Sequence, residues 1–369
     1  MEDTLTEAQY EIARMEELAE AGYEYPSEFP QTVDLPTYRM KYPEDEMEPG
    51  ARLMDKREKI AGRIRDKRAS GKNLYFYTLQ TGGITLQLLA DRREFEDRTE
   101  FRRINKLLHR GDIVGAEGFV GRSKRGELSL YPTKLVLLAP CFRSIPKIHL
   151  GLTDVETRTR KRYFDLVSNP STHSTFLLRS NLIKYLRSFL DARDFVEVQT
   201  PILSFQAGGA TAKPFTTYHN ELKQSMFLRI APELFLKRLV VGGLERVYEI
   251  GPQFRNEGMD STHNPEFWTL EFYQAYMDYR GLMELAQKML SQMVLKLTGS
   301  YKLEYTPAHV EEPIILDFTP PFAVLDIPEE LAKVGLVLPP DLSSPDAQVY
   351  LSAECAERGV GCPYPRTSA

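Results

Sequence analysis

Hydrogen-bonding and aromatic side chains are concentrated in the stretch FRNEGMDSTHNPEFWTLEFYQAY, which runs from Phe254 to Tyr276. It combines one arginine, three glutamates, one histidine and two asparagines with many aromatic residues and almost no aliphatic ones. Large aromatic side chains suit a surface that stacks a planar ligand, so the combination favours a ligand-binding face. A solvated sheet face with salt bridges is the alternative. It explains the charges, but not why Phe267 and Trp268 are interleaved with them.

As a β-hairpin, this stretch separates into two faces, because successive side chains of a strand point to opposite sides of the sheet. The residues predicted to form the polar face are Glu249, Gln253, Arg255, Glu271 and Tyr273. The apolar face holds Leu270 and Phe272, and the connecting loop adds Glu257, His263 and Asn264. The alternation therefore predicts a polar face for a ligand, opposite an apolar face that packs on a core.

Elements that position this hairpin begin near residue 151. A helix is predicted over residues 176–195, with an apolar stripe of Leu178, Leu182, Leu186 and Phe189. The elements expected next are a strand ending at Pro201, a Gly-rich segment over 205–215, a strand over 225–230, a helix over 231–243 and a strand over 246–250. A helix then continues to about Thr298, and an irregular, Pro-rich chain follows to Ala369.

The first part of the chain predicts a different unit. A surface helix closed by Gly22 and a Pro-rich extended segment precede a run of short strands. The predicted strands cover residues 58–64, 73–80, 84–91, 112–123 and 127–140, and a helix over 97–111 lies between the third and the fourth. This is the element order of the OB-fold barrel, which binds oligonucleotides across its second and third strands.

The charge distribution supports the same interpretation. Residues 1–50 carry 14 acidic against 3 basic side chains, whereas residues 51–149 carry 22 basic against 11 acidic ones. The net charge of the whole chain is only −5. A basic block inside an acidic protein indicates a local polyanionic partner, and it coincides with the predicted barrel.

Composition bounds the remaining possibilities. The chain has 369 residues, enough for two or three domains, and 42% of them are hydrophobic. No apolar run approaches the roughly 18 residues of a membrane-spanning helix, and the acidic start is unlike a signal peptide. Cys141, Cys355 and Cys362 form an odd set without metal-like spacing, which favours buried thiols in a reducing compartment. A cytoplasmic protein without a membrane partner is expected.

The motifs carry a family resemblance. The pattern FRNEG…HNPEF…EFYQAY resembles motif 2 of the class II aminoacyl-tRNA synthetases, and FLDARDFVEVQTPIL is similar to their motif 1. AGGATAKPF, RIAPELFLKRLVVGG and RVYEI resemble the lysyl members, and AGRIRDKRASGKNLYFY resembles their anticodon-binding barrel. The resemblance implies an α+β multidomain fold, with a five-stranded OB-fold barrel followed by a partial antiparallel synthetase sheet flanked by helices. The expected domains are an acidic extension over 1–50, the barrel over 51–150 and the catalytic domain over 151–369.

The resemblance also implies a reaction. Such enzymes activate L-lysine with ATP and Mg²⁺ to lysyl-adenylate and pass the lysyl group to tRNA(Lys). The lysine carboxylate is the nucleophile, so catalysis consists mostly of positioning and charge neutralisation. Arg255 is the expected catalytic residue, because its fork of donors would grip the α-phosphate. The residues implied to bind ATP are Arg255, Asn256, Glu257, His263, Asn264, Phe267 and Glu271.

Other positions follow from the same resemblance. Lysine would be held by Gly209, Glu233, Glu271 and Tyr273. The anticodon would be read by Phe76, Gln87 and Arg63, although Phe76 is open to the alternative that it belongs to the barrel core. Pro201 ends a strand whose family counterpart lies at a two-fold interface, which implies a homodimer.

One part of the family pattern is missing. Motif 3, with its Gly-rich strand and ATP-clamping arginine, is not found, and RGVGCPYPR (358–366) imitates it only superficially. The resemblance thus implies a chain truncated before motif 3, with the magnesium ligands beyond Ala369. A noncatalytic RNA-binding remnant is the alternative to an active ligase. Lysine-dependent pyrophosphate exchange separates the two, and we expect none from these 369 residues alone.

Overall fold

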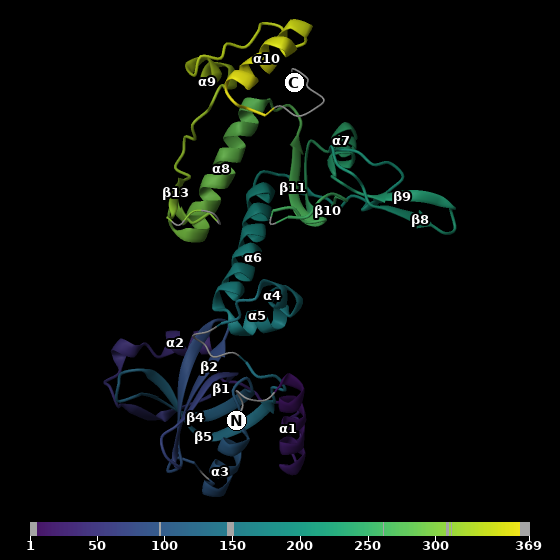
Figure 1. The fold of residues 1–369 in the computed structure, drawn as a ribbon. Coiled ribbons are helices and arrows are strands. Elements are labelled where there is room, and N and C mark those ends of the chain that lie inside the picture. Colours follow the sequence, from purple (N-terminus) through teal and green to yellow (C-terminus); the bar gives the residue numbers. More distant parts are fainter. Residues whose placement is uncertain are drawn as a thin grey trace. The chain divides into compact units, whose positions relative to one another are not determined.

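The computed structural model describes residues 6–95, 97–145, 151–260, 262–307, 310 and 312–361. The chain divides into two compact units, Met1–Ser180 and Asn181–Ala369. Figure 1 follows the chain through both. Each unit is built around its own sheet, so each is described separately. Cys141 and Cys355 are free thiols, but they are only partly buried rather than buried as predicted, and Cys362 lies outside the described residues.

The first unit contains a closed five-stranded barrel. Its strands are β1 (Arg52–Ala69), β2 (Leu74–Thr81), β3 (Ile84–Asp91), β4 (Ile113–Arg122) and β5 (Leu128–Ala139), in the order β1-β2-β3-β5-β4. Helix α3 (Arg98–Leu107) lies between β3 and β4 in the sequence, as predicted. Inward-facing residues such as Ile60, Leu79 and Leu130 are fully buried. The predicted OB-fold order is confirmed.

Strand β1 is much longer than the predicted 58–64. Its first part pairs with β4 from Arg52 to Arg63, and its last part pairs with β2 from Arg63 to Ala69. Register shifts between Leu53 and Arg57 and between Ile64 and Asp66 accompany this change of neighbour. A bulge bends a strand and increases its twist, which allows one strand to serve both sides of a closed barrel.

Residues before the barrel pack into its core. Helix α1 (Glu7–Glu20) begins with a Thr6–Gln9 capping box, and α2 (Leu35–Lys41) is capped by Asp34; a short 3₁₀ helix, η2 (Glu44–Glu46), follows. Leu18, Leu35 and Tyr38 belong to the same buried cluster as the barrel strands. The predicted surface helix therefore has one buried face, and residues 6–50 share the core of the barrel.

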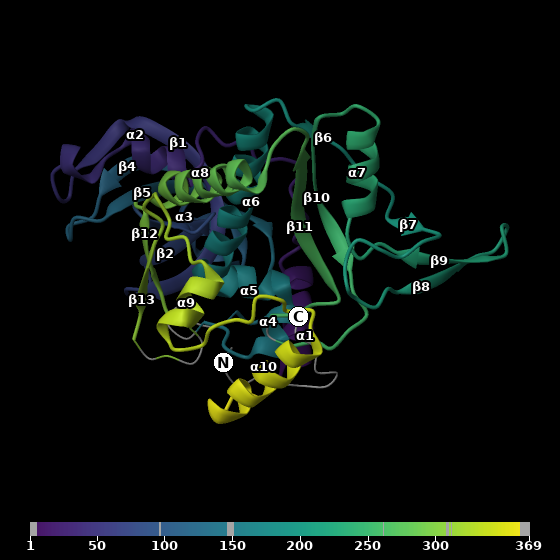
Figure 2. The ribbon, with the colours of Figure 1, turned by 90° about the horizontal axis from the view of Figure 1, so that it is seen from above.

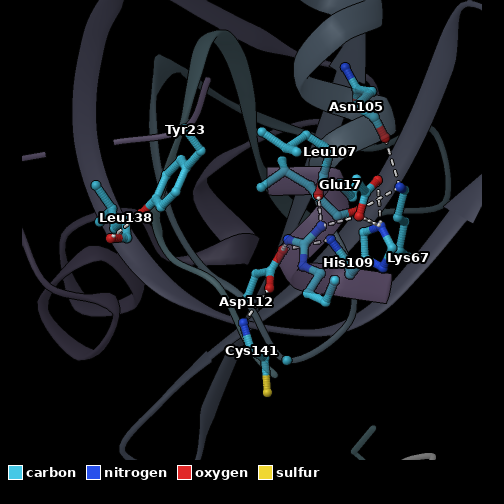
Figure 3. A network of polar contacts seen from close by, with 12 residues as sticks. Glu17, Tyr23, Lys67, Asn105, Leu107, His109, Asp112, Leu138 and Cys141 are labelled. Atoms are coloured by element: carbon cyan, nitrogen blue, oxygen red, sulfur yellow. Dashed lines mark hydrogen bonds and ion pairs between the residues drawn. The ribbon is translucent and has the colours of Figure 1, made fainter. Parts of the chain in front are cut away.

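A polar network fixes α1 to the barrel (Figure 3). Arg14 is 2% exposed and donates to the Leu107 carbonyl at 2.8 Å and to Asp112 Oδ2 at 2.7 Å. Asp112 also accepts from the backbone amides of His109 and Cys141, each at 2.7 Å. A buried charge is tolerated when it is paired and hydrogen-bonded in this way.

Three helices follow the barrel. They are α4 (Val155–Arg160), α5 (Arg162–Ser168) and α6 (Pro170–Asp191), and α6 continues from the first unit into the second. The buried carboxylate of Asp165 joins them locally, since it accepts from Arg158, Arg162 and Asn169. In α6, Tyr185, Phe189 and Leu190 are buried, whereas Leu178 of the predicted stripe is 49% exposed.

The second unit is organised around a three-stranded sheet in the order β11-β10-β6. Strand β6 (Val196–Glu197) runs parallel to β10 (Arg246–Phe254), which pairs antiparallel with β11 (Glu266–Gln274). One face buries Tyr248 against α6 and α8 (Tyr279–Thr298). In Figure 2, α7 (Glu233–Val241) lies beside the same sheet.

A second small sheet in this unit consists of β7 (Leu203–Ser204), β9 (Gln224–Leu228) and β8 (Thr216–His219), in that order. The predicted strand ending at Pro201 is reduced to the two residues of β6. After α8, the chain forms the hairpin β12 (Lys302–Tyr305) and β13 (Ile314–Asp317) and helices α9 (Ile327–Lys333) and α10 (Pro345–Glu357). The prediction of irregular chain there is wrong. Ser344 caps α10 and Pro345 opens it, a recognisable start signal.

Candidate functional site

The β10–β11 hairpin has the two faces that alternation predicts. Its register pairs Glu249 with Glu271, Val247 with Tyr273, and Gln253 with Phe267. Directly opposed side chains lie on the same face, so the polar residues of both strands form one surface. The opposite face contributes Ile250, Leu270 and Phe272 to the apolar cluster under α6 and α8.

A buried ion pair anchors the polar face. Arg229 follows β9, is 5% exposed, and pairs with Glu249, which is 3% exposed. Thr200 donates to Glu249 Oε2 through its hydroxyl at 2.7 Å, and Arg229 Nε donates to the Pro252 carbonyl at 3.0 Å. A Cβ on Gly251 would lie 2.7 Å from Arg229 Nη2, so the guanidinium needs a glycine there. These contacts join β9, β10 and the segment after β6.

Arg255 extends from the end of β10 over an aromatic ring. Its guanidinium carbon lies 4.9 Å from the Phe267 ring centroid, in a cation–π contact. Its Nε is shielded from solvent and has no hydrogen-bond partner among the described residues. The backbone of Asn256 donates to the Lys213 carbonyl at 2.8 Å, and the Lys213 amide donates to Glu257 Oε1 at 3.4 Å. The Gly-rich segment thus supports the start of the hairpin loop.

An acidic patch lies on the same face, where α7 meets the sheet. Tyr273 donates to Glu271 Oε1 at 2.8 Å. Burial raises the pKa of Glu271, and the negative charges of Glu233 and Glu249 add to this effect. Glu233 accepts from Lys237 Nζ at 2.7 Å, and this ammonium lies 5.8 Å from the Tyr273 ring centroid. The patch therefore already contacts one ammonium group, supplied by the chain itself.

Gly209 brings the Gly-rich segment against this patch. Its φ of +90° lies in the left-handed region that side chains disfavour. A Cβ at this position would lie 3.1 Å from Glu233 Cβ. The structure therefore places Gly209, Glu233, Glu271 and Tyr273 in one neighbourhood, as the sequence interpretation required.

His263 lies in a different environment. It contacts Asp260 of its own loop, with Nδ1 2.8 Å from Asp260 Oδ2, and its side chain is 73% exposed. Hydrogen bonds from Thr262 and His263 lower the pKa of Asp260. Asn264 is also exposed. This loop is held by local contacts, so His263 and Asn264 are available to a ligand but are not fixed beside Arg255.

The barrel has a hollow of about 600 Å³ on its outer surface. Its lining is Arg52, Arg68, Ala69, Ser70, Leu74, Phe76, Gln87, Leu89, Asp91, Arg93, Ser123, Lys124, Arg125, Glu127 and Tyr131. We call this the β2–β3 hollow. Phe76 and Gln87 both line it, and five of the lining side chains are cationic. Arg63 does not line it; its Nη1 donates to the Gly111 carbonyl at 2.6 Å.

Comparison with known proteins assigns both regions. The family model described as tRNA synthetases class II (D, K and N) matches residues 154–360, more than half of the chain. The chain belongs to this class II tRNA synthetase family. The model described as OB-fold nucleic acid binding domain matches residues 58–138, which cover the described barrel apart from the first residues of β1 and the last of β5.

Individual relatives of this synthetase chain carry one name. It is 43% identical to lysine–tRNA ligase cla4 of Cladosporium cladosporioides, over 94% of the chain and 59% of that relative. It is 45% identical to a probable cytoplasmic lysine–tRNA ligase of Encephalitozoon cuniculi, over 83% of the chain and 60% of that relative. It is 46% identical to the lysine–tRNA ligase of Tolumonas auensis, over 75% of the chain and 53% of that relative. The chain thus spans about three fifths or less of the length of these relatives.

Sequence reasoning overlooked two groups that the synthetase fold brings to the β2–β3 hollow. Arg68 pairs in register with Phe76, so it shares the outer face of the sheet. Glu127 accepts from Gln87 Nε2 at 2.6 Å. The alternation along β1 could have revealed Arg68, but the bulge between Ile64 and Asp66 shifts the parity. No local signal marks Glu127, which reaches Gln87 only through barrel closure.

Two further observations concern metal ligands and membrane-spanning helices in the synthetase chain. Among the described residues, no group of three or more His, Cys, Asp or Glu side chains is arranged to bind a metal ion. In the same part of the chain, no helix combines the length and apolar character that crossing a membrane requires. The first finding means that no described residue set is assigned to magnesium.

Proposed function

We propose that this chain carries the amino-acid-activating and anticodon-reading parts of a lysine–tRNA ligase. The reaction joins L-lysine to ATP, releases pyrophosphate, and passes the lysyl group from lysyl-adenylate to tRNA(Lys). The observation that carries the proposal is the hairpin face, where a cation on an aromatic ring lies on the same surface as an acidic patch. The names of the relatives agree with this assignment.

Arg255 and Phe267 provide the nucleotide end of the site. The lysine carboxylate attacks the α-phosphorus, so the protein has to stabilise the developing phosphate charge rather than supply a nucleophile. The shielded Nε of Arg255 is a donor without a partner among the described residues, which suits a phosphate oxygen. Adenine would stack on Phe267. Asn256, Glu257, His263 and Asn264 would close over the base and the phosphates from the loop.

The acidic patch provides the lysine end. Burial disfavours the charged form of Glu271 and raises its pKa, and repulsion from the neighbouring charges of Glu233 and Glu249 adds to this effect. A lysine ammonium would relieve this repulsion, whereas an aspartate side chain would increase it. Tyr273 orients Glu271 through its hydroxyl, and Gly209 leaves room for the backbone of the amino acid. Selectivity for a cationic substrate follows from Coulomb interactions at short range.

Magnesium is proposed to enter with ATP. Mg²⁺ usually binds through one or two carboxylates together with substrate phosphates. Because the described residues offer no such cluster of three or more ligands, no side chain is assigned to the ion. The steps above therefore depend on Arg255 and the acidic patch alone.

The anticodon would bind at the β2–β3 hollow. Phe76 is half-buried there and packs against the apolar cluster of Leu89, Phe119 and Tyr131. Base stacking on such a ring is tolerant of sequence, while the Gln87 amide can read a base edge. Five cationic side chains around the hollow would attract the phosphates. Gln87 and Phe76 are thus proposed as the reading residues.

We further propose that the ligase is a cytoplasmic homodimer. Pro201 is exposed, as are the apolar residues Ile202, Leu203 and Phe205 that follow it. Pro201, Leu203 and Phe205 line a pocket of about 440 Å³, together with Leu234 and Phe235. An exposed apolar strip of this kind suits burial against a second copy. Sedimentation equilibrium would test it, since a Leu203→Glu variant should shift the equilibrium to monomer.

The experiment that tests the function is calorimetric titration of the chain with non-reactive analogues of aminoacyl-adenylates. The lysyl analogue should bind at least about 100-fold more tightly than the aspartyl one, because a like charge buried in the patch costs several kcal/mol. Glu233→Gln should weaken the lysyl analogue more than ATP alone. Equal affinities for both analogues would exclude a lysine site.

A second candidate, RNA binding without catalysis, is favoured by one observation. The β2–β3 hollow is complete within the first unit and needs no residue of the second. Lysine-dependent ATP–pyrophosphate exchange distinguishes the two functions. Exchange supports the ligase, whereas anticodon binding without adenylate-analogue binding supports the noncatalytic role.

A further inference from the structure

Arg63, predicted to read the anticodon, instead lines a separate small pocket on the first unit. The pocket has a volume of about 140 Å³. Its lining is Arg63, Gln80, Thr81, Gly82, Gly83, Leu166, Val167 and His173. Guanidinium, amide, hydroxyl and imidazole groups therefore converge on one space. Typical small-molecule sites are roughly 300–1,000 Å³, so this one is too small for a nucleoside.

Positive charge accumulates next to this pocket. Arg65 is 2% exposed and donates to the carbonyls of Val167 at 2.6 Å and Ser168 at 3.4 Å. Burial lowers the pKa of Arg65, and the neighbouring charges of Arg63 and Arg110 lower it further. Within the described chain, no carboxylate forms an ion pair with Arg63 or Arg65, and Arg65 Nε has no hydrogen-bond partner.

Arg65 caps the last carbonyls of α5 and Arg63 binds the Gly111 carbonyl, but a neutral carbonyl does not balance the charge of a guanidinium group. Three neighbouring guanidinium groups repel one another, and the repulsion is strong where water is excluded. An anion in the pocket would remove this cost. A phosphate group matches the charge, the size and the fork geometry of arginine donors.

The pocket shares a barrel face with the β2–β3 hollow. Arg63 is paired with Gln80, Thr78 with Gln87, and Phe76 with Leu89, so these residues project from the same side of the sheet. Four residues of β2 separate Phe76 from Gln80, which is about 13 Å along a strand. An RNA that places a base on Phe76 can therefore reach the pocket with its backbone.

We propose that this pocket binds a backbone phosphate of the RNA whose bases occupy the β2–β3 hollow. The inference rests on the proposed anticodon-binding function and adds a fixed point for the RNA backbone. Arg65 adds positive charge next to Arg63 and donates hydrogen bonds to the last carbonyls of α5. Arg63 contacts the phosphate directly. Such a contact positions the RNA without reading its sequence.

Salt dependence of RNA binding tests the proposal. The affinity of the full chain for an anticodon stem-loop with a U-rich anticodon is measured by fluorescence anisotropy between low and moderate salt. Each phosphate contact contributes roughly 0.7–0.9 to the slope of log K against log salt. Arg63→Gln should lower the slope by that amount and weaken binding for all anticodon sequences alike. Arg63→Lys, which keeps the charge, should retain the slope.

A matched control lies on the same strand. Lys59 is four residues before Arg63, and its Nζ is paired with Glu117 at 3.0 Å. Lys59→Gln removes the same unit of charge but does not line the pocket, so the slope should stay at the wild-type value. If Arg63→Gln and Lys59→Gln lower the slope equally, the effect is one of net charge and the pocket is not a phosphate site.

The results of these measurements separate an RNA phosphate from a free anion, and separate failure of this inference from failure of the anticodon function. A slope loss in Arg63→Gln that neither Arg63→Lys nor Lys59→Gln shows supports the RNA phosphate. An unchanged slope, together with an inorganic-phosphate-dependent rise in melting temperature that Arg63→Gln abolishes, places a free anion in the pocket and overturns the proposal. If the wild-type chain does not bind the stem-loop, the anticodon function itself fails; an unchanged slope with normal binding defeats only this inference.

Discussion

The two candidate sites of this synthetase chain differ in how their polar groups are satisfied. In the β2–β3 hollow, Gln87 is 8% exposed and uses both ends of its amide, donating to Glu127 and accepting from Ser129 at 3.1 Å. On the hairpin face, Arg255 Nε and Gln253 Oε1 are shielded and have no hydrogen-bond partner among the described residues. The hollow is therefore complete before its ligand arrives, and the hairpin face is not.

The charged groups of the two sites differ in the same way, since cations of the hollow pair with carboxylates, whereas carboxylates of the hairpin face lie close to one another. In the hollow, Arg52 pairs with Glu94 at 2.6 Å, and Arg93 pairs with Asp91 at 2.6 Å. On the hairpin face, burial raises the pKa of Glu271, and the like charges of Glu233 and Glu249 add to this effect. If the two proposed functions hold, the comparison indicates that the anticodon site has its hydrogen bonds satisfied before binding, whereas the activating site keeps unmet interactions for its substrates.

The largest effect is expected at the buried pair that anchors the hairpin face. Arg229→Met leaves Glu249 buried without its cation, which should cost about 3–5 kcal/mol of unfolding free energy. Trp268 is the single tryptophan and lies in β11, so its fluorescence during urea denaturation reports on this unit. The control is Arg187→Met, which removes an exposed pair with Glu197 and should cost less than about 1 kcal/mol. Equal small losses would show that Glu249 does not depend on Arg229.

A smaller effect is expected when the unsatisfied donor is removed. Arg255→Ala should weaken binding of the lysyl-adenylate analogue by about 2–4 kcal/mol, the range for losing one partner of a desolvated charge pair. The unfolding free energy should change little, because Arg255 has no carboxylate partner to leave unpaired in the described chain. Calorimetry and the Trp268 unfolding curve measure the two quantities. A large stability loss without a loss of affinity would make Arg255 structural and remove the contrast between the sites.

Periodicity was sufficient to predict most of this architecture. The five barrel strands, α3, α7 and the two faces of the β10–β11 hairpin follow from alternation and turn residues that act locally. The acidic patch was also predictable, because Glu271 and Tyr273 are two residues apart on one strand. Their meeting with Gly209 and Glu233 required the family resemblance, since it joins distant segments.

The features that the sequence did not reveal have non-local causes. The resemblance placed Arg63 with Phe76 and Gln87 at the anticodon, whereas the structure lines the β2–β3 hollow with Arg68, beyond the bulge after Ile64, and places Arg63 in a separate pocket. Leu178 continues a helical stripe but is left exposed, since the core of α6 begins at Tyr185. Arg14 sits within an acidic helix, and nothing in the sequence indicates that Asp112 receives it. Such pairings depend on closure of the tertiary structure.

In the hollow, the expected effect is moderate and confined to RNA binding. Phe76→Ala should weaken stem-loop binding by about 1–3 kcal/mol through loss of stacking. The salt slope should stay unchanged because no charge is removed, which distinguishes this variant from Arg63→Gln. Phe76→Tyr keeps a ring and is the matched control. Loss of melting temperature rather than affinity would assign Phe76 to the barrel core, the alternative that its apolar neighbours Leu89 and Phe119 leave open.

The smallest effect concerns the pH dependence of the hairpin face. Burial raises the pKa of Glu271 above the ordinary 4.5, so the folded state holds this proton more tightly than the unfolded state. Unfolding then releases a proton, and the unfolding free energy must fall as the pH rises from the ordinary pKa through the raised one. Glu271→Gln removes this component. Above that interval it should be slightly more stable than wild type, but it should bind the lysyl analogue less tightly.

The measurement is the Trp268 unfolding transition in urea at several pH values from 4 to about 8, across the ordinary carboxyl range. Glu266→Gln is the control, because Glu266 is an exposed residue of the same strand; its curve should run parallel to that of the wild type. If Glu271→Gln is less stable at neutral pH, the hydrogen bond from Tyr273 outweighs the repulsion from Glu233 and Glu249. The hairpin face would then be as satisfied as the hollow. If Glu271→Gln is more stable than wild type but binds the lysyl analogue less tightly, the repulsion around Glu271 serves substrate binding. The reason is that a bound ammonium ion would be attracted by Glu233, Glu249 and Glu271 together, and this attraction would offset their mutual repulsion.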